Sequence, residues 1–251
     1  VVDPTDTKTV TRGKQRIDQG GIMYTPVSGI WKTVWLEPVE STHINRILPE
    51  ADILNHKVDL DIDVSRAKGG EKVKIDLYDD GKLVNSINRL LTDKIELAVP
   101  DAVLWSPASP KLYRFHVQLS RGNEVLDEVS SYFTLREVSV QKDMCGYNRV
   151  GLNGKPIFQY GTLDQGWWPD GLLTPPSEEA MLWDMVQLKA MGFNTIRKHI
   201  KVEPELYYYY ADSLGLMMWQ DMVSGFETER RSEQCPGPYA AKDWEAPHEH
   251  A

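Results

Sequence analysis

A strict two-residue alternation between residues 40 and 138 constrains this chain more than any other feature. In the run KVDLDIDV, apolar side chains at every second position from Val58 to Val64 alternate with aspartates, which gives a strand one apolar face and one acidic face. The runs EKVKIDLYDDGK and KLYRFHVQLS repeat the pattern, and Asp80 with Gly81 supplies a hairpin turn. We therefore predict an antiparallel β-sandwich of immunoglobulin type over residues 40–138. Its inward-facing residues are expected to be Val58, Leu60, Ile62, Val73, Ile75, Leu77, Phe115 and Val117.

From about Ser139 the pattern changes to strands that alternate with helices. Three apolar runs read as strands: PIFQYGTL, FNTIRKHI and LMMWQDM. The helix between the first two is expected to begin at Ser177 and stop at Gly192, and the next to open with Pro204 at its first position and close at Gly215. Successive β-α-β units predict parallel strands. The apolar faces of the two helices are predicted to carry Met181, Met185 and Leu188, and Leu206, Tyr210 and Leu214.

Residues 1–39 are polar and rich in turns. The run KTVWLEPV at their end alternates apolar and other residues, which favours one or two strands. So short and polar a stretch cannot form a core of its own, and no Met or apolar leader begins it. We therefore expect it to be the end of a domain whose beginning lies outside this sequence, and the chain to be an internal fragment.

Charge and composition exclude several classes of partner. The net charge is -9 and the sequence holds no basic run, which disfavours nucleic acid. No apolar stretch approaches the ~20 residues of a membrane-spanning helix, so no membrane is expected either. Two cysteines suggest neither a disulfide framework nor a metal site. His248 and His250 flank a single Glu without a third ligand nearby, and we expect neither metal nor cofactor.

Five phrases carry a resemblance to a known family, in one order along nearly the whole chain. They are SGIWKTVWLEPV, LWSPASPKLYRFHV, NGKPIFQYG, MGFNTIRKHI and YYYYADSLGLMMWQD, and together they resemble glycoside hydrolase family 2, the β-galactosidase-like glycosidases. The resemblance implies a multidomain β plus α/β chain: the end of a jelly-roll sugar-binding-type domain over residues 1–39, an immunoglobulin-like antiparallel sandwich over 40–138, and the start of a (β/α)8 TIM barrel, three of its eight strands, over 139–251.

The resemblance also implies a chemistry. Family members are retaining glycosidases that hydrolyse terminal β-linked sugars by a two-carboxylate double displacement. β-Galactosidase is the leading specificity, and β-glucuronidase and β-mannosidase share the architecture. The family's acid/base Glu follows an Asn near the fourth barrel strand and its nucleophile lies near the seventh. Both are therefore expected beyond Ala251, so that no catalytic residue lies in this chain and the chain alone is expected to be inactive. Family resemblance favours a periplasmic or secreted protein.

The sharpest candidates for substrate binding end the second and third barrel strands. The resemblance assigns to Arg197 the support of the nucleophile and to His199 contact with sugar hydroxyls, although RKH is one residue shorter than the family's R-x-S-H-Y-P. A salt bridge without function is the alternative for Arg197. Asp221 at the end of the third strand suits either substrate binding or a structural hydrogen bond. Glu203 and Glu227 are further acidic residues of this region, with no role assigned by the resemblance.

The loop TLDQGWWPDG follows the first strand and supplies four more candidates, Asp164, Gln165, Trp167 and Trp168. Adjacent indoles in a Gly- and Pro-rich loop suit a sugar-stacking wall, because a pyranose offers an apolar face to an indole. Trp219 has the same use, and simple packing is the alternative for each. Since the loops that follow parallel barrel strands meet at one end, we expect four of the candidates to converge on one rim: Arg197, His199, Asp164 and Asp221.

Two hypotheses from other classes remain beside the glycosidase. The chain is alternatively a non-catalytic carbohydrate-binding or spacer module, or part of a different (β/α)8 enzyme with a sandwich in front. An Asn-Glu dipeptide and a second Glu in a longer parent sequence would favour the glycosidase. The sequence leaves the sugar, the linkage and the oligomeric state open.

Overall fold

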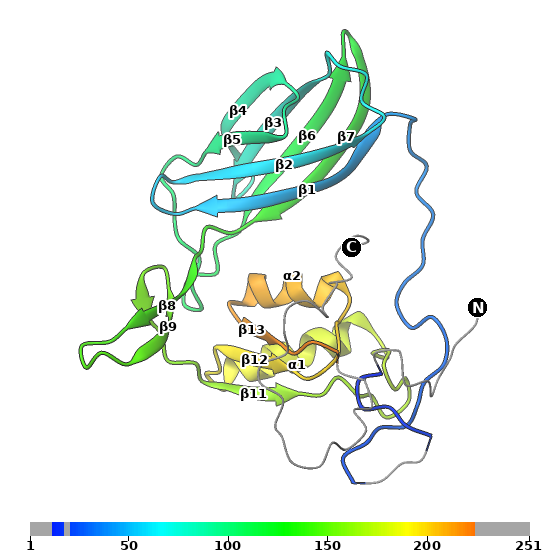
Figure 1. Ribbon diagram of the computed structural model, residues 1–251, viewed down its shortest axis with the longest axis vertical. Helices are drawn as coiled ribbons and strands as arrows, with labels where there is room; N and C mark the ends of the chain where they lie inside the picture. The colour runs from blue at the N-terminus through cyan, green and yellow to red at the C-terminus, as the bar shows by residue number, and fades with distance from the viewer. Residues whose placement is uncertain (1–11, 18–20, 224–251) are drawn as a thin grey trace, which may run out of the picture. The chain divides into compact units, whose positions relative to one another are not determined.

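The computed structural model describes residues 12–17 and 21–223. The chain divides into two compact units, one of residues 1–28 with 223–251 and one of residues 29–222. In the first unit, Gln15 and Tyr24 form an isolated β-bridge. The second unit holds all the helices and strands that follow (Figure 1).

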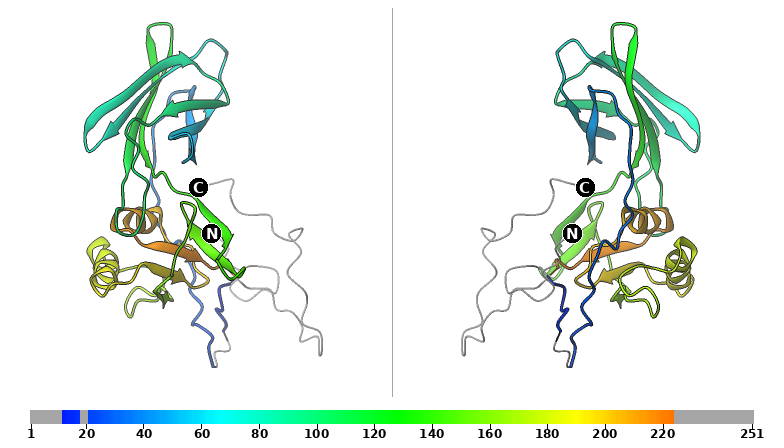
Figure 2. Two further views of the ribbon diagram at one scale, coloured as in Figure 1. Left: turned by 90° about the vertical axis from the view of Figure 1, so that its left-hand side faces the viewer. Right: turned by 90° about the vertical axis from the view of Figure 1, so that its right-hand side faces the viewer.

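Two antiparallel sheets make up the first half of the larger unit (Figures 1 and 2). The three-stranded sheet has the order β1-β2-β5, and the four-stranded sheet has the order β4-β3-β6-β7. The predicted sandwich is thus confirmed as two antiparallel sheets within residues 40–138. Their strands are β1 (His43–Asp52), β2 (Lys57–Ser65), β3 (Lys72–Asp79), β4 (Lys82–Leu90), β5 (Lys94–Ala98), β6 (Tyr113–Arg121) and β7 (Glu124–Phe133).

The inward face of the sandwich follows the alternation of the sequence. All eight residues predicted to face inward are buried, with at most 4% of their surface exposed. They share one core with Ile95, Leu97 and Tyr113. At the β3–β4 hairpin, Asp80 and Gly81 both have positive φ angles, 47° and 81°, which a tight two-residue hairpin requires. The period of two therefore predicted both the strands and their buried faces.

One buried carboxylate makes the sandwich sensitive to acid. Glu71 is 2% exposed, and its Oε1 accepts hydrogen bonds from Arg121 at 2.5 Å and from the Lys68 backbone N–H at 2.7 Å. The hydrogen bond from Arg121, followed by that from Lys68, lowers the pKa of Glu71 from 4.5 to about 2. Because the folded pKa lies below the ordinary one, this carboxylate stabilises the fold above about pH 4.5 and loses that effect as the pH falls towards 2.

Glu71→Gln is accordingly expected to lower the free energy of unfolding by about 2 kcal/mol near neutral pH, where a charged hydrogen bond is lost. The difference from the unchanged chain should shrink as the pH falls from 4.5 to 2, the window set by the two pKa values. Urea unfolding of both chains across this range measures it. Glu124→Gln, at the exposed start of β7, is the control. A difference that stays constant with pH would contradict the assignment.

A small antiparallel sheet follows the sandwich, where the sequence pattern predicted a direct change to strands and helices. Its strands are β8 (Val138–Lys142), β9 (Asn148–Leu152) and β10 (Lys155–Pro156), in the order β10-β9-β8. Asn153 and Gly154 turn the chain between β9 and β10 with φ angles of 51° and 77°. An Asn-Gly pair is the strongest short hairpin signal, so this sheet could have been predicted from the sequence.

The α/β part is built on a parallel sheet in the order β11-β12-β13, as the alternation of strands and helices predicted. Its elements are β11 (Gly161–Asp164), α1 (Glu178–Ala190), β12 (Thr195–Lys198), α2 (Glu205–Leu214) and β13 (Met217–Gln220). Ser177 caps α1 as expected, since its Oγ accepts a hydrogen bond from the Ala180 N–H at 3.1 Å. Gly215, in the left-handed conformation, ends α2. No helix in the described part of the chain is long and apolar enough to cross a membrane.

Three local expectations were wrong. Residues 32–39 form no strand, and Trp35 and Leu36 are exposed; strands need partners for their backbone groups, and none pairs with this stretch among the described residues. The first parallel strand begins only at Gly161, since residues 157–160 are irregular. Pro204 precedes α2 as its N-cap and does not occupy its first position. The predicted Leu206, Tyr210 and Leu214 do pack against the core of the α/β part, half-buried beside the fully buried Tyr207 and Ala211.

Asp212 of α2 joins the α/β part to the sandwich. Its carboxylate accepts hydrogen bonds from Arg136 at 2.5 Å and Tyr132 at 3.1 Å, and its backbone carbonyl accepts one from the Trp105 indole N–H at 2.8 Å. The Arg136 guanidinium also lies 4.6 Å from the centre of the Trp105 ring. Trp105 is 1% exposed, so its indole is fully buried at this junction, whereas the Arg136–Asp212 pair is partly exposed.

Candidate functional site

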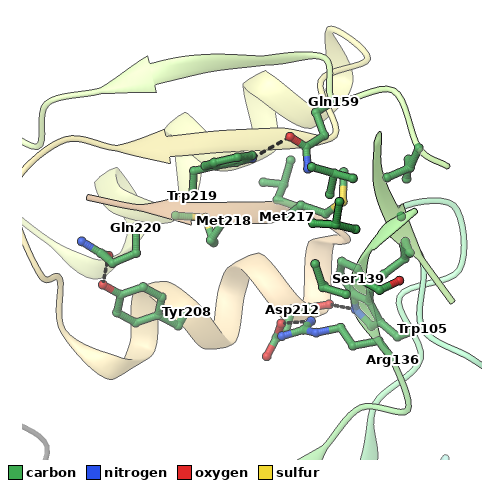
Figure 3. A pocket seen from close by; sticks show the side chains of 17 residues that line it. Trp105, Arg136, Ser139, Gln159, Tyr208, Asp212, Met217, Met218, Trp219 and Gln220 are labelled. Carbon is green, nitrogen blue, oxygen red and sulfur yellow. Dashed lines mark hydrogen bonds and ion pairs between the residues drawn. The ribbon is translucent and has the colours of Figure 1, made fainter. Parts of the chain in front are cut away.

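The carboxyl ends of the three parallel strands carry two rows of side chains, one on each face of the sheet. Leu163, Arg197 and Trp219 lie side by side in register and are exposed. Asp164, Lys198 and Gln220 form the next row. Because neighbouring residues of a strand point to opposite faces, the second row faces α1 and α2, with Ile196. Figure 3 shows this opposition at β13, where Trp219 points to Gln159 and Gln220 points to Tyr208 of α2.

On the open face, Asp221 holds Arg197 and His199 together. Arg197 donates two hydrogen bonds to Asp221, from Nε to Oδ1 and from Nη2 to Oδ2, both 3.0 Å long. His199 Nδ1 lies 3.0 Å from Oδ2 of the same carboxylate. The hydrogen bond from Arg197, and then that from His199, hold the pKa of Asp221 below its ordinary value. With Nδ1 engaged by Asp221, the ring presents Nε2 as its second polar atom.

On the helix side, Asp164 and Lys198 belong to a buried polar network. Lys198 is 1% exposed, and its Nζ contacts Asp164 Oδ2 at 2.9 Å and also Glu203 Oε1. Tyr207 donates a hydrogen bond to Asp164 Oδ2 at 2.7 Å. Burial alone would raise the pKa of Asp164, but the charge of Lys198 and the hydrogen bond from Tyr207 outweigh it and leave this pKa lowered. Burial, together with the charge of Asp164, raises the pKa of Tyr207, which stays a neutral donor.

Lys201 fastens the β11–α1 loop, residues 165–177, to this network. Its Nζ donates to the carbonyl oxygens of Gly166 and Leu173, each at 2.7 Å, and lies 2.9 Å from Glu203 Oε1. The Trp31 ring covers it at 4.9 Å. Burial lowers the pKa of Lys201, against the opposing charge of Glu203. A lysine so placed fixes the loop that carries the paired indoles.

The remaining predicted residues lie around these two groups. Trp167 and Trp168, in the β11–α1 loop, are half-buried, and Gln165 in the same loop is exposed. Trp219 is 49% exposed, and its indole N–H donates to Gln159 at 2.6 Å. Glu227, like His248 and His250, lies outside the described residues. Within the described part of the chain, no group of three or more His, Cys, Asp or Glu is arranged to hold a metal.

Two cavities adjoin the sheet. The larger, of about 560 Å³, lies between β13 and the β8–β9 hairpin and has a mostly apolar lining; the charges of Arg136 and Asp212 at its edge neutralise each other (Figure 3). The smaller, of about 250 Å³, is lined by Asp164, Trp167 and Trp168 among others. Convergent polar groups beside aromatic walls are typical of ligand sites, so the smaller cavity is the stronger candidate.

The sequence thus named residues that the structure places in two groups. Arg197, His199 and Asp221 are brought together on the open face, with Trp219 in the same row as Arg197. Asp164 lies at the same end of the sheet, but its carboxylate faces the helices. Lys198, Lys201 and Tyr207 were missed, because lysine is rarely buried and the tyrosine run suggested packing. The close spacing of the basic and acidic residues in RKHIKVE was the signal for them.

Comparison with known proteins gives a family match to the sandwich and matches to single relatives over most of the chain. The model of the glycosyl hydrolases family 2 matches residues 42–136, the sandwich. A protein of Formosa agariphila named "Putative beta-glucuronidase" is 28% identical over 226 residues, which are 86% of this chain and 21% of that protein. The β-galactosidase of Lactococcus lactis is 25% identical over 78% of this chain and 19% of its own length. The chain therefore spans about a fifth of the length of these curated relatives.

Solved structures of the same kind match as well. A β-glycosidase from Bacteroides vulgatus superposes with a TM-score of 0.67 and 26% identity, over 78% of this chain and 26% of that one. β-Glucuronidase 3 from Bacteroides uniformis gives a TM-score of 0.58 and 27% identity, over 73% and 23% of the two chains. These matches reach beyond the sandwich into the α/β part, because the sandwich alone is much shorter than the shared length.

Proposed function

Since this chain belongs to glycosyl hydrolase family 2, we propose that it forms part of a β-glycosidase that hydrolyses terminal β-linked sugars. The observation that carries this proposal is the Arg197–Asp221–His199 group at the carboxyl ends of parallel strands. Active sites of (β/α)8 enzymes are built at that end of the strands. A guanidinium fixed by two hydrogen bonds can support a neighbouring carboxylate, and an imidazole held at Nδ1 can contact a sugar hydroxyl.

The proposal includes the domain plan that the resemblance implies. Residues 139–251 would begin a (β/α)8 barrel with β11, β12 and β13 as its first three strands, residues 40–138 are the sandwich, and residues 1–39 would end a jelly-roll domain. Support comes from the parallel order of the three strands and from their row of exposed side chains, Leu163, Arg197 and Trp219, which further strands would cover. The acid/base and the nucleophile of a double displacement would come from elsewhere in the whole protein.

The charges at the strand ends favour a neutral sugar over a uronic acid. A glucuronide needs a cation for its carboxylate, but Arg197 is paired with Asp221, and Lys198 and Lys201 both bind Glu203. Breaking the pairs of Lys198 and Lys201 would leave a buried charge without its partner, which is costly. Arg197 is exposed, but both of its hydrogen bonds in the group already go to Asp221. We therefore rank β-galactoside above β-glucuronide as the substrate of the whole protein. β-Mannoside remains the third candidate.

The test is hydrolysis of aryl β-galactoside, β-glucuronide and β-mannoside by the natural protein that contains this sequence. We expect turnover of the galactoside first, and Asp221→Asn should lower kcat/KM about a hundredfold or more, because Arg197 and His199 both lose their charged partner. Asp143→Asn is the matched control, since Asp143 also pairs with an arginine, Arg149, at 2.8 Å but in the β8–β9 hairpin. Its kcat/KM should be unchanged.

Sugar binding without turnover of any of the three glycosides would contradict the proposal and favour a carbohydrate-binding or spacer module. Preferred turnover of the glucuronide would overturn the ranking of substrates but would still agree with the proposal of a β-glycosidase. We further propose, from the family resemblance, that the protein is periplasmic or secreted. Activity confined to the cytoplasmic fraction of the source cells would refute that location.

A further inference from the structure

The segment that precedes the sandwich contacts the β11–α1 loop. The Trp31 backbone carbonyl accepts a hydrogen bond from the Thr174 hydroxyl at 3.1 Å, although the two residues are 143 positions apart in the sequence. The Trp31 ring lies with its centre 4.9 Å from the ammonium group of Lys201. Lys201 in turn donates hydrogen bonds to the loop carbonyls of Gly166 and Leu173. Trp31 therefore holds the loop in two ways, directly through its backbone and indirectly through its ring.

The surroundings of the Lys201 ammonium group show what the ring does. An ammonium group has three hydrogen-bond donors, and here the carbonyls of Gly166 and Leu173 and the Oε1 atom of Glu203 receive them, at 2.7, 2.7 and 2.9 Å. Lys201 is 5% exposed. The Trp31 ring attracts the ammonium group and shields it, but offers no competing acceptor. Loss of the ring would admit water, which competes with the loop carbonyls for the same donors.

The β11–α1 loop has a compact shape of its own and rests directly on buried lysines. Trp168 and Leu172 exchange two backbone hydrogen bonds, of 2.8 and 3.0 Å. At Gly166, where φ is 67°, a Cβ atom would lie 2.5 Å from Lys198 Nζ and 2.8 Å from Lys201 Cδ, so the loop backbone reaches the lysines only because this residue has no side chain. Since the internal hydrogen bonds preserve the shape of the loop, weaker outer attachments would let the loop shift as a body.

Asp164 joins this loop to the open face of the sheet. Its Oδ1 accepts a hydrogen bond from the Gly166 backbone N–H at 2.7 Å, and its backbone carbonyl accepts one from the His199 backbone N–H at 2.9 Å. His199 is the residue that Asp221 holds in the candidate site. A shift of the loop at Gly166 therefore reaches the backbone of His199 through a single residue.

From these contacts we propose that Trp31 is a positioning residue for the active site: its ring, through Lys201, holds the β11–α1 loop in the place that fixes His199. Active sites of (β/α)8 enzymes are built from the loops that follow the strands, so one such loop would depend on a residue that lies before the sandwich. The inference rests on the proposed function for the view that this end of the sheet binds the substrate.

Hydrogen exchange in the 251-residue chain tests the contact itself. Trp31→Ala removes the ring and keeps the backbone carbonyl that binds Thr174, so amide exchange of residues 166–174 should become about tenfold faster, while exchange in the sandwich stays unchanged. Trp31→Phe keeps an aromatic face and should restore slow exchange. Lys32→Met is the matched control, because Lys32 Nζ also lies over the Trp31 ring, at 5.3 Å, but is exposed and makes no hydrogen bond to the loop among the described residues.

Kinetics of the natural protein that contains this sequence test the consequence for the site. Trp31→Ala should raise KM for the aryl β-galactoside about fivefold or more and change kcat less than about twofold, because a sugar contact held by the loop and His199 is made in the bound substrate and in the transition state alike. Trp31→Phe should restore KM, and Lys32→Met should leave it unchanged.

The inference is overturned if Trp31→Ala does not accelerate exchange in the loop, or if it accelerates exchange and leaves KM unchanged. Faster exchange throughout the sandwich would overturn it too, because the ring would then serve general packing. If the natural protein hydrolyses none of the three glycosides, the proposed function fails, whereas loop exchange still decides whether Trp31 holds the loop. Failure of the inference and failure of the proposed function are therefore distinguished.

Discussion

Replacement of Lys198 by methionine is expected to lower the free energy of unfolding of the α/β part by about 3–5 kcal/mol, the usual cost of removing one partner from a buried ion pair. Methionine fills a similar volume, so packing is largely kept. Asp164 and Glu203 would lose the ammonium group that they share, and Glu203 is itself 3% exposed. Hydrogen exchange of the amides in β11, β12 and β13 measures the local loss without interference from the sandwich.

The neighbouring residue provides the control. Arg197 also pairs with an aspartate, but its side chain is 57% exposed, and an exposed ion pair contributes little to stability. Arg197→Met should therefore leave exchange in the three strands nearly unchanged. Equal losses of amide protection in the two variants would show that the network around Lys198 is solvated, and would contradict the prediction.

The 251-residue chain by itself is expected to hydrolyse no aryl β-galactoside, β-glucuronide or β-mannoside above the uncatalysed rate. Retaining hydrolysis needs a carboxylic acid that keeps its proton near neutral pH and a second carboxylate about 5 to 5.5 Å away. Asp164, Glu203 and Asp221 each bind a lysine or an arginine. The pKa values of Asp164 and Asp221 are lowered, which is the wrong direction for a proton donor.

Steady release of nitrophenol by the purified chain, beside the natural protein as positive control, is the measurement. Turnover that Asp221→Ala abolishes and Asp143→Ala leaves intact would contradict the expectation. It would place a catalytic carboxylate at the end of β13.

The sandwich was predictable because its information is local. An alternation of apolar and polar residues states which side chains are buried without any knowledge of the partner strand, and Val58, Leu60 and Ile62 were placed correctly for that reason. Residues 32–39 show the limit of the same rule. Val34 and Leu36 alternate as well, yet both are exposed, because alternation describes what a strand can bury and supplies no partner.

The candidate site was predictable in position and less so in orientation. Arg197, His199 and Asp221 meet because ends of parallel strands meet, which follows from the order of elements alone. The face to which Asp164 points was not predictable. The strand starts at Gly161, five residues after the start of the apolar run PIFQYGTL, and a strand of so few residues carries too little alternation to fix a face.

Asp212 has a consequence for exchange of segments between relatives. Asp212, a residue of α2, accepts hydrogen bonds from Trp105, Tyr132 and Arg136, which belong to the sandwich and to the segment that follows it. The two parts therefore cannot be recombined as independent modules. A chimera that takes its sandwich from a relative should be well folded only when the incoming segment brings an indole and a guanidinium at the positions of Trp105 and Arg136, so that these two residues are expected to be inherited together with Asp212.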